Sequence, residues 1–147
     1  MKGRDTLFSH ATDEWETPQD LFDELDKEFH FELDVAASCE NYKCDWFFTS
    51  DENGLEEDWG SVTVWRNPPY SNIKEWAKKC SEHRGVAVML VPARTDTRWF
   101  HDYCYNKNNV ELRFIKGRLK FSNSKNSAPF PSMLVIFHGD DKYGKNT

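Results

Sequence analysis

The tetrapeptide Asn67-Pro68-Pro69-Tyr70 sets a polar, a rigid and an aromatic residue type side by side, and this order suits chemistry on a planar amine. The side-chain oxygen of Asn67 can accept one hydrogen bond, and the backbone carbonyl of Pro68 can accept a second. Together they can hold both hydrogens of a conjugated –NH2 group, and they stabilise the positive charge that develops when its nitrogen attacks an electrophile. The prolines fix φ, so the acceptors are in place before a substrate arrives. Tyr70 offers a flat face on which a base can stack.

The run before this tetrapeptide predicts where it lies. Residues 62–65 are apolar and β-branched, which is typical of a buried strand. Open α/β folds keep their ligands beyond the carboxyl ends of such strands, so the tetrapeptide is expected at a binding edge. The alternative is a loop whose prolines merely end the strand. A base paired inside a duplex cannot reach this corner, so a double-stranded substrate requires base flipping.

The rest of the chain alternates between helix and strand patterns. Thr17 is expected to cap a first helix that has Pro18 at its first position and apolar residues up to Phe29. Ser71 is expected to cap a second helix that runs to about His83. Further strands are expected at 31–36, 62–66, 86–91, 110–115 and 132–138, with a strand or buried loop at 46–49, a turn and short helix at 51–60, a helix near 96–105 and a hairpin arm at 119–121. This alternation predicts an α/β fold with right-handed crossovers and a hairpin-like end.

Size and composition favour one folded domain. The chain has 147 residues, of which 38% are hydrophobic and 15% aromatic, so a single domain over 1–147 is expected, with flexible ends at 1–13 and 139–147. No apolar run is long enough to span a membrane, and residues 1–5 lack the apolar stretch of a signal peptide, so a cytoplasmic protein is expected. The cysteines form no paired Cys-x-x-Cys spacing, and no bound metal is expected.

The charge is unevenly distributed along the sequence. A net charge of −6 argues against a general nucleic-acid coat protein but leaves room for a local basic patch. Acidic residues crowd the first sixty positions, whereas the C-terminal half carries a basic series: Arg113, Lys116, Arg118, Lys120 and Lys125. This series predicts either a phosphate-facing surface or an ordinary solvated face.

Several segments taken together resemble the small Dam-type DNA N6-adenine methyltransferases of phages and prophages. The matching segments are residues 15–18 (Trp-Glu-Thr-Pro), 31–37, 67–70, 89–96, 116–121 and 128–132. The resemblance implies a Rossmann-like methyltransferase fold, with a mostly parallel sheet, helices on both faces and a C-terminal hairpin. It also implies S-adenosylmethionine as the cofactor and the N6 amine of adenine in DNA as the acceptor, in a bacterial host cytoplasm.

The resemblance suggests which residues meet the cofactor. Thr17 and Pro18 look like a Thr-Pro pair that meets its methionine end, although they could simply begin a helix. Asp34 and the small residues after it, Ala36 and Ser38, look like the turn after the first strand, without the usual Gly-x-Gly; Asp34 could instead cap local backbone N–H groups. Candidates for contact with the adenosine are Thr49, Asp51 and Asn53, and the alternative for the last two is a plain turn.

The resemblance also suggests residues that face the target base and the DNA. Phe121 or Phe130 would stack on the base, with core packing as the alternative for both rings. Arg118 and Lys120 would contact DNA, Arg118 through a phosphate, and Arg94 would line the same cleft.

Two departures from the family keep other functions open. The stretch between Asp34 and Asn67 has no room for a separate target-recognition domain, so specificity would be loose or supplied by a partner or a homodimer mate. The same chemistry also serves the N4 amine of cytosine, adenine in RNA and the glutamine amide of a protein. A non-catalytic remnant that binds cofactor or nucleic acid is the alternative from another class, motivated by the missing glycines.

Overall fold

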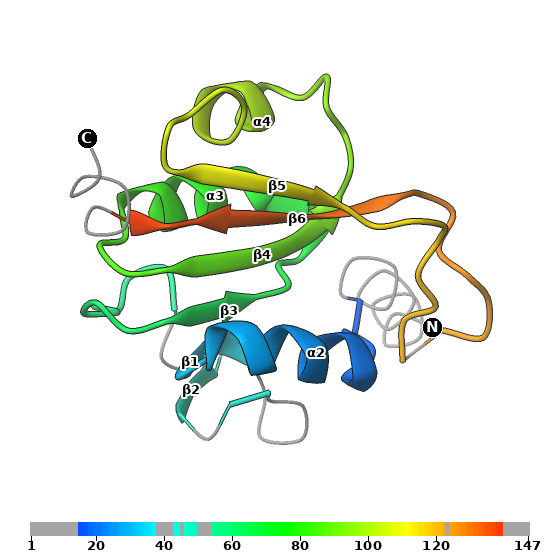
Figure 1. Ribbon diagram of the computed structural model, residues 1–147, viewed down its shortest axis with the longest axis horizontal. Coiled ribbons are helices and arrows are strands. Elements are labelled where there is room, and N and C mark those ends of the chain that lie inside the picture. The colour runs from blue at the N-terminus through cyan, green and yellow to red at the C-terminus, as the bar shows by residue number, and fades with distance from the viewer. Residues whose placement is uncertain (1–14, 38–42, 45, 50–53, 123, 140–147) are drawn as a thin grey trace, which may run out of the picture.

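The computed structural model describes residues 15–37, 43–44, 46–49, 54–122 and 124–139, which form one six-stranded sheet with helices on both faces (Figure 1). The strands are β1 (Leu33–Ala37), β2 (Trp46–Thr49), β3 (Val64–Arg66), β4 (Ala87–Pro92), β5 (Val110–Phe114) and β6 (Ser132–Phe137). The helices are α2 (Gln19–Phe29), α3 (Ile73–Glu82) and α4 (Arg98–Tyr103), with a 3₁₀ turn, η1 (Tyr70–Asn72).

The strand order is β2-β1-β3-β4-β6-β5. It places β1, which leads to the predicted cofactor turn, beside β3, which leads into the tetrapeptide. Strands β2, β1, β3 and β4 are mutually parallel, and Asp34 in β1 pairs with Trp65 in β3, two residues before Asn67. After β1 the chain passes to β2 on one side, and after the neighbouring β3 it passes to β4 on the other side. Loops that diverge in this way from neighbouring strand ends form the crevice in which open α/β sheets bind ligands. The predicted α/β class is therefore confirmed.

The last strand changes the sheet from parallel to mixed. β6 lies antiparallel to both β4 and β5, and it separates these two strands. The predicted hairpin-like end is thus the pair β5 and β6, which a long connection over residues 115–131 joins. The expected arm at 119–121 is wrong, because these residues form no strand.

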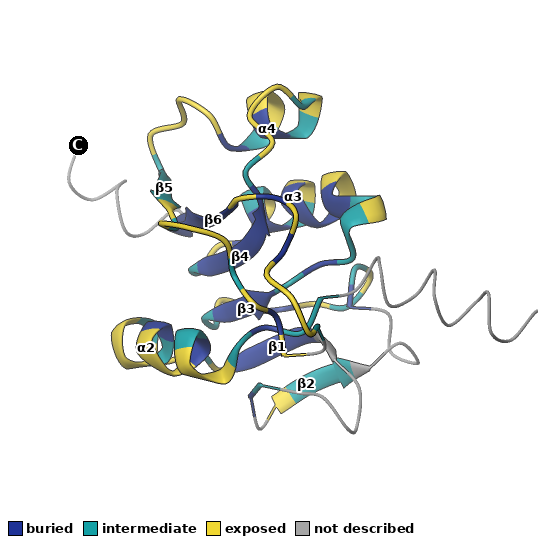
Figure 2. Cartoon of the chain, turned by 90° about the vertical axis from the view of Figure 1, so that its right-hand side faces the viewer, coloured by how far each residue is buried: buried dark blue, intermediate teal, exposed yellow. Residues whose placement is uncertain are grey.

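Two apolar layers fix the sheet between its helices. On one face, Ile73, Trp76, Ala77 and Cys80 of α3 pack with Phe100 of α4 against the strands. On the other face, Phe22 and Leu25 of α2 pack against the sheet together with residues of the 115–131 connection. Figure 2 shows β4 and β6 buried between these layers, and every residue of both strands is buried. The alternation of side chains along β3 and β4 distributes their apolar residues over both layers.

The predicted start of α2 is wrong in one detail that matters for the site. The helix begins at Gln19 with Pro18 as its N-cap, and no side chain caps it. Thr17, the expected cap, lies one residue earlier, and its hydroxyl accepts a hydrogen bond from Asn67 instead. Ser71 is likewise not a cap, because it lies inside η1 and Asn72 precedes α3.

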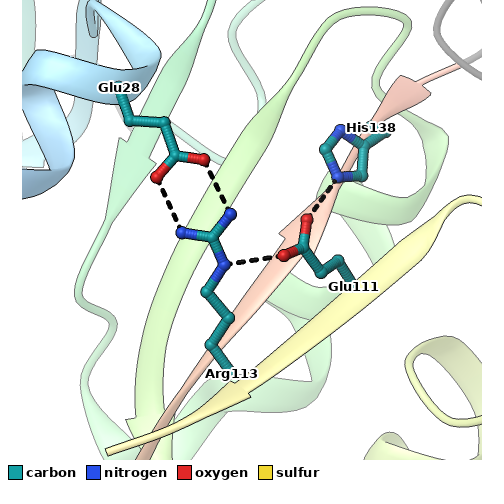
Figure 3. A network of polar contacts seen from close by, with 4 residues as sticks. All are labelled: Glu28, Glu111, Arg113 and His138. Atoms are coloured by element: carbon teal, nitrogen blue, oxygen red, sulfur yellow. Dashed lines mark hydrogen bonds and ion pairs between the residues drawn. The ribbon is translucent and has the colours of Figure 1, made fainter.

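A polar network ties the far end of α2 to the edge of the sheet (Figure 3). Arg113 of β5 donates from both terminal nitrogens to the carboxylate of Glu28, at 2.7 Å each, and from Nε to Glu111 at 2.7 Å. His138 Nε2 lies 2.9 Å from the other Glu111 oxygen. Hydrogen bonds from Arg113 hold the pKa of Glu111 below its ordinary value; burial opposes this shift and the contact with His138 adds to it. Bidentate pairs of this kind orient the elements that they join.

Among the described helices, none has both the length and the apolar character that a membrane span requires.

Candidate catalytic corner and cofactor edge

Asn67 leaves β3 with its side-chain amide already oriented. Its Nδ2 donates to the backbone carbonyl of Trp15 and, at 2.9 Å, to the hydroxyl of Thr17. Since both acceptors face the nitrogen, the amide has one sensible orientation. Its Oδ1 is buried and meets no hydrogen-bond partner within the described chain. The oxygen expected to grip an amine is thus available, and the nitrogen holds it in place.

The backbone around Asn67 is fixed from behind. Arg66 is buried, with its guanidinium carbon 4.0 Å from the centroid of the Trp76 ring, and it donates to the Asn67 carbonyl at 3.2 Å. Pro68 is buried and Pro69 half-buried, and the Pro69 carbonyl accepts from the Asn72 N–H at 3.2 Å to close η1. The corner is therefore rigid in the way that pre-placed acceptors require.

Tyr70 belongs to a group of four rings, called here the aromatic cluster: Trp15, Tyr70, Phe121 and Phe130. The Tyr70 and Trp15 rings are nearly parallel, at 21°, with centroids 6.2 Å apart. Phe130 meets both of them edge-on, at 5.3 and 5.4 Å. Burial raises the pKa of the Tyr70 phenol, and the positive charge of Arg94 opposes this only partly. Tyr70 is therefore a neutral ring at neutral pH.

The two predicted stacking residues reach this cluster from the 115–131 connection. Phe121 and Phe130 are both buried, and the Phe121 ring lies 5.2 Å from Trp15. Ser122 holds the connection against the start of α2: its N–H donates to the Glu16 carbonyl at 2.9 Å, and its hydroxyl to the Thr17 carbonyl at 3.3 Å. Figure 1 shows this connection curving past the start of α2. Residues 15–17 are thus held by Asn67 as well as by the connection.

Trp15 and Ser122 also belong to this site, although the sequence predicts no role for either. Trp15 is only the first residue of a matching segment, and its position two residues before Thr17 is the one local signal that points to it. Ser122 carries no motif at all. Both act through partners that are distant in sequence, Asn67 and Glu16, which local patterns do not reveal.

The predicted cofactor residues that the structure describes, Thr17, Pro18, Asp34, Ala36 and Thr49, belong to β1, β2 and the segment just before α2. Thr17 is buried and Pro18 half-buried. Asp34 is buried, and its Oδ2 accepts from the Lys43 N–H at 3.0 Å, which is the backbone-capping role that the sequence left open. Ala36 lies in β1, Thr49 ends β2, and Ala37 pairs with Thr49, so the two strand ends are neighbours. Ser38, Asp51 and Asn53 lie outside the described residues.

Gly54 brings the chain back to this edge at a point where only glycine fits. A Cβ there would lie 1.8 Å from the carbonyl oxygen of Val35 in β1. Its own carbonyl accepts from Trp59 Nε1 at 2.9 Å. Gly54 is thereby held close against the β1 backbone.

The predicted basic residues separate into two groups. Arg94, Lys116, Arg118, Lys120 and Lys125 are exposed on the loop after β4 and on the 115–131 connection. These two loops meet where the Ala93 N–H donates to the Pro131 carbonyl at 2.9 Å. Arg113 differs, because Glu28 and Glu111 engage its guanidinium. The exposed cations therefore follow the carboxyl ends of β4 and β5, which lie at the same end of the sheet as the carboxyl end of β3.

The comparison with known proteins identifies the class to which this fold and site belong. The chain belongs to the DNA N-6-adenine-methyltransferase (Dam) family, whose model matches residues 4–142. It is 36% identical over 133 residues to the DNA N-6-adenine-methyltransferase of Escherichia phage T1, an alignment that covers 87% of this chain and 55% of that protein. It is also 32% identical over 65 residues to the putative methyltransferase YfdM of Escherichia coli strain K12, across 40% of this chain and 71% of that protein.

These matches confirm the family inferred from the sequence segments. The chain nevertheless spans only about half the length of the phage T1 protein.

Proposed function

We propose that this protein transfers a methyl group from S-adenosylmethionine to the N6 amine of adenine in DNA. The observation that carries the proposal is the state of Asn67: its Nδ2 is held by Trp15 and Thr17, while its buried Oδ1 has no partner within the described chain. A buried oxygen acceptor without a donor costs stability, and an incoming –NH2 group would satisfy it. The names of the family and of the phage T1 relative support adenine in DNA as the acceptor.

The residues present fit a bound methyl donor. Thr17, predicted at the methionine end of the cofactor, shares a hydrogen bond with Asn67, predicted at the target amine. A methyl donor and its acceptor must meet, so a bond between their two predicted binding residues supports both assignments. S-adenosylmethionine would supply a methyl carbon activated by its sulfonium sulfur. Thr17 and Pro18 would hold its methionine end. Asp34, Ala36 and Ser38 would form the turn against which the cofactor lies, and Thr49 or Asn53 would contact its adenosine.

The chain's own residues account for the reactivity of the amine. Asn67 Oδ1 and the Pro68 carbonyl would each accept one N–H of the adenine amine, turning the nitrogen lone pair out of the ring. The same acceptors stabilise the positive charge that grows on this nitrogen in the transition state. Tyr70, neutral and flat, would stack on the base rather than take its proton. Catalysis then rests on placement, which the rigid backbone of the corner supports.

DNA would approach the edge that carries the exposed cations. Arg94, Arg118 and Lys120 are exposed there, with Phe121 and Phe130 packed behind them against Tyr70 and Trp15. The cations would contact the backbone phosphates, and the target adenine would leave the duplex to reach Asn67. A single Rossmann-like domain over residues 1–147, with no separate target-recognition domain inserted between Asp34 and Asn67, is part of this proposal. Sequence choice would then come from a homodimer mate or a partner protein.

The test is product analysis. Purified protein is incubated with isotope-labelled cofactor and unmethylated DNA of mixed sequence, and the DNA is digested to nucleosides. Label in N6-methyladenine is expected. Label in N4-methylcytosine, or in RNA or protein glutamine offered in parallel, would identify another acceptor. If no substrate is labelled although calorimetry shows cofactor binding, the chain is a binding remnant and the proposal is wrong.

A further inference from the structure

Trp15 occupies a position that neither the family match nor the tetrapeptide explains. It precedes α2, yet its ring contacts each of the other three rings of the aromatic cluster. Its backbone carbonyl accepts from Asn67 Nδ2, so the residue is anchored to the catalytic corner itself. The indole is half-buried, and the Trp15 Nε1 atom is buried.

We propose that Trp15 is a base-binding residue whose indole covers the face of the target base opposite Tyr70. This inference rests on the proposed function. The Tyr70 and Trp15 rings come from separate parts of the chain and face one another at 21°. Two flat rings that face one another beside Asn67 form the walls that hold a planar base for reaction at its edge.

The spacing of the two rings indicates a site that is closed until a base enters. Stacked bases lie about 3.4 Å apart, so a base between two rings separates their planes by about 7 Å. The Tyr70 and Trp15 centroids are 6.2 Å apart, which leaves no room for a third ring. Trp15 must therefore move outward as the base enters. The hydrogen bond from Asn67 to its carbonyl links this movement to the residue that receives the amine.

The polar atoms around the cluster point to a ligand that is polar at its edges. Asn67 Oδ1, the Tyr70 hydroxyl and Trp15 Nε1 are all buried and lack hydrogen-bond partners within the described chain. Native interiors leave few such groups, so a concentration of them at one place indicates a site completed by binding. A nucleobase has flat faces for the two rings and nitrogen donors and acceptors at its rim.

The experiment uses a fluorescent adenine analogue in place of the target. Sequencing first locates an adenine that the wild-type protein methylates, and duplexes are then made with 2-aminopurine at that position. The wild-type complex should emit weakly, because two aromatic walls quench the extruded analogue. Trp15→Leu fills much of the same volume without a π face, so its complex should be brighter. Its KM for unmodified DNA should rise roughly tenfold, as expected for the loss of one stacking wall.

Two controls separate stacking from folding. Trp15→Phe keeps a ring and should stay closer to the wild-type emission and KM than Trp15→Leu. Trp46→Ala removes an exposed tryptophan of β2 outside the cluster and should change neither. Calorimetric cofactor binding and the melting temperature establish whether each variant is folded.

The outcomes distinguish this inference from the function on which it rests. If the wild-type protein methylates no adenine, the proposed function is wrong, and the inference that rests on it is overturned as well. If it does methylate adenine but folded Trp15→Leu matches it in emission and in KM, Trp15 is only a packing residue and the inference is overturned. The inference is also overturned if Trp15→Phe loses as much as Trp15→Leu.

Discussion

The amide of Asn67 and the hydroxyl of Thr17 are joined by a 2.9 Å hydrogen bond across fifty positions of sequence. Asn67 follows the last residue of β3 and opens the tetrapeptide, and Thr17 lies two residues before the first described helix. The bond fixes the orientation of the Asn67 amide, and with it the direction of the Asn67 side-chain oxygen. Under the proposed function, it would couple the geometry at the target amine to the geometry at the methionine end of the cofactor.

Asn67→Ala should lower the methyl-transfer rate by roughly 10²-fold or more, because it removes one acceptor that stabilises the transition state. Cofactor binding, measured by calorimetry, should remain largely intact. Asn108→Ala, at an exposed position before β5, is the matched control and should retain wild-type turnover. Unchanged turnover in Asn67→Ala would show that the acceptor is another group.

Thr17→Val should reduce turnover more than Thr17→Ser. Valine has nearly the shape of threonine but removes the oxygen that receives the Asn67 N–H, whereas serine keeps that oxygen. The valine variant should also lose about 1–3 kcal/mol of unfolding free energy, since a half-buried amide loses an acceptor. Urea unfolding and single-turnover rates measure the two effects. Equal rates for the valine and serine variants would show that the Thr17 hydroxyl does not contribute to catalysis.

Gly54→Ala should destabilise the fold by about 3 kcal/mol or more, because its Cβ would lie 1.8 Å from the Val35 carbonyl oxygen. Gly60→Ala is the comparison, since nothing lies within 4 Å of its Cβ and its cost comes from a φ of +62° alone. That substitution should cost about 1–2 kcal/mol. Urea denaturation of both variants provides the measurement, and a smaller loss at Gly54 than at Gly60 would contradict the close approach.

Glu111→Gln should weaken the dependence of stability on acid pH. The pKa of Glu111 is lowered in the folded state, chiefly by hydrogen bonds from Arg113. A lowered pKa means that the stabilisation is present above the ordinary glutamate pKa and is lost as the pH falls through the lower folded value. Melting temperatures between about pH 6 and pH 3 should therefore fall less steeply in the variant than in the wild type. If the melting temperatures of the variant and the wild type fall in parallel with pH, Glu111 does not contribute to the loss of stability in acid.

Arg118→Ala and Lys120→Ala should each weaken DNA binding similarly across sequences. Each should also reduce the slope of log affinity against log salt concentration by about one, as for one lost phosphate contact. Lys78→Ala, an exposed change on α3, is the matched control and should leave the slope unchanged. If all three variants keep the wild-type slope, DNA binds another face.

Local sequence patterns predicted where helices and strands lie better than they predicted which strands pair with one another. The continuous apolar run at 86–91 predicted a buried central strand, and β4 is buried along its whole length. That β6 would lie against it in the opposite direction could not be predicted, because pairing across forty residues leaves no local signal. The helix predicted to run to about His83 is present as α3, which ends at Glu82.

The candidate site was predicted less completely than the fold, because it depends on contacts between residues that are distant in sequence. The tetrapeptide predicted a polar corner at a strand end, which is where Asn67 lies. Thr17 was expected to cap a helix, as its type favours, but the amide of Asn67 competes successfully for its hydroxyl. Trp15 and Ser122 belong to the site only because segments that are distant in sequence contact each other there, which local patterns do not predict.

The insertion of β6 between β4 and β5 has a consequence for how this protein matures on the ribosome. Within the described residues, β5 pairs with β6 alone, and β6 follows the other five strands of the sheet in the sequence. Until residues 132–137 leave the exit tunnel, neither β5 nor the cation-bearing connection before β6 can settle against the growing domain. The part of the sheet that carries the exposed cations therefore takes its final form only after β6 has been synthesised.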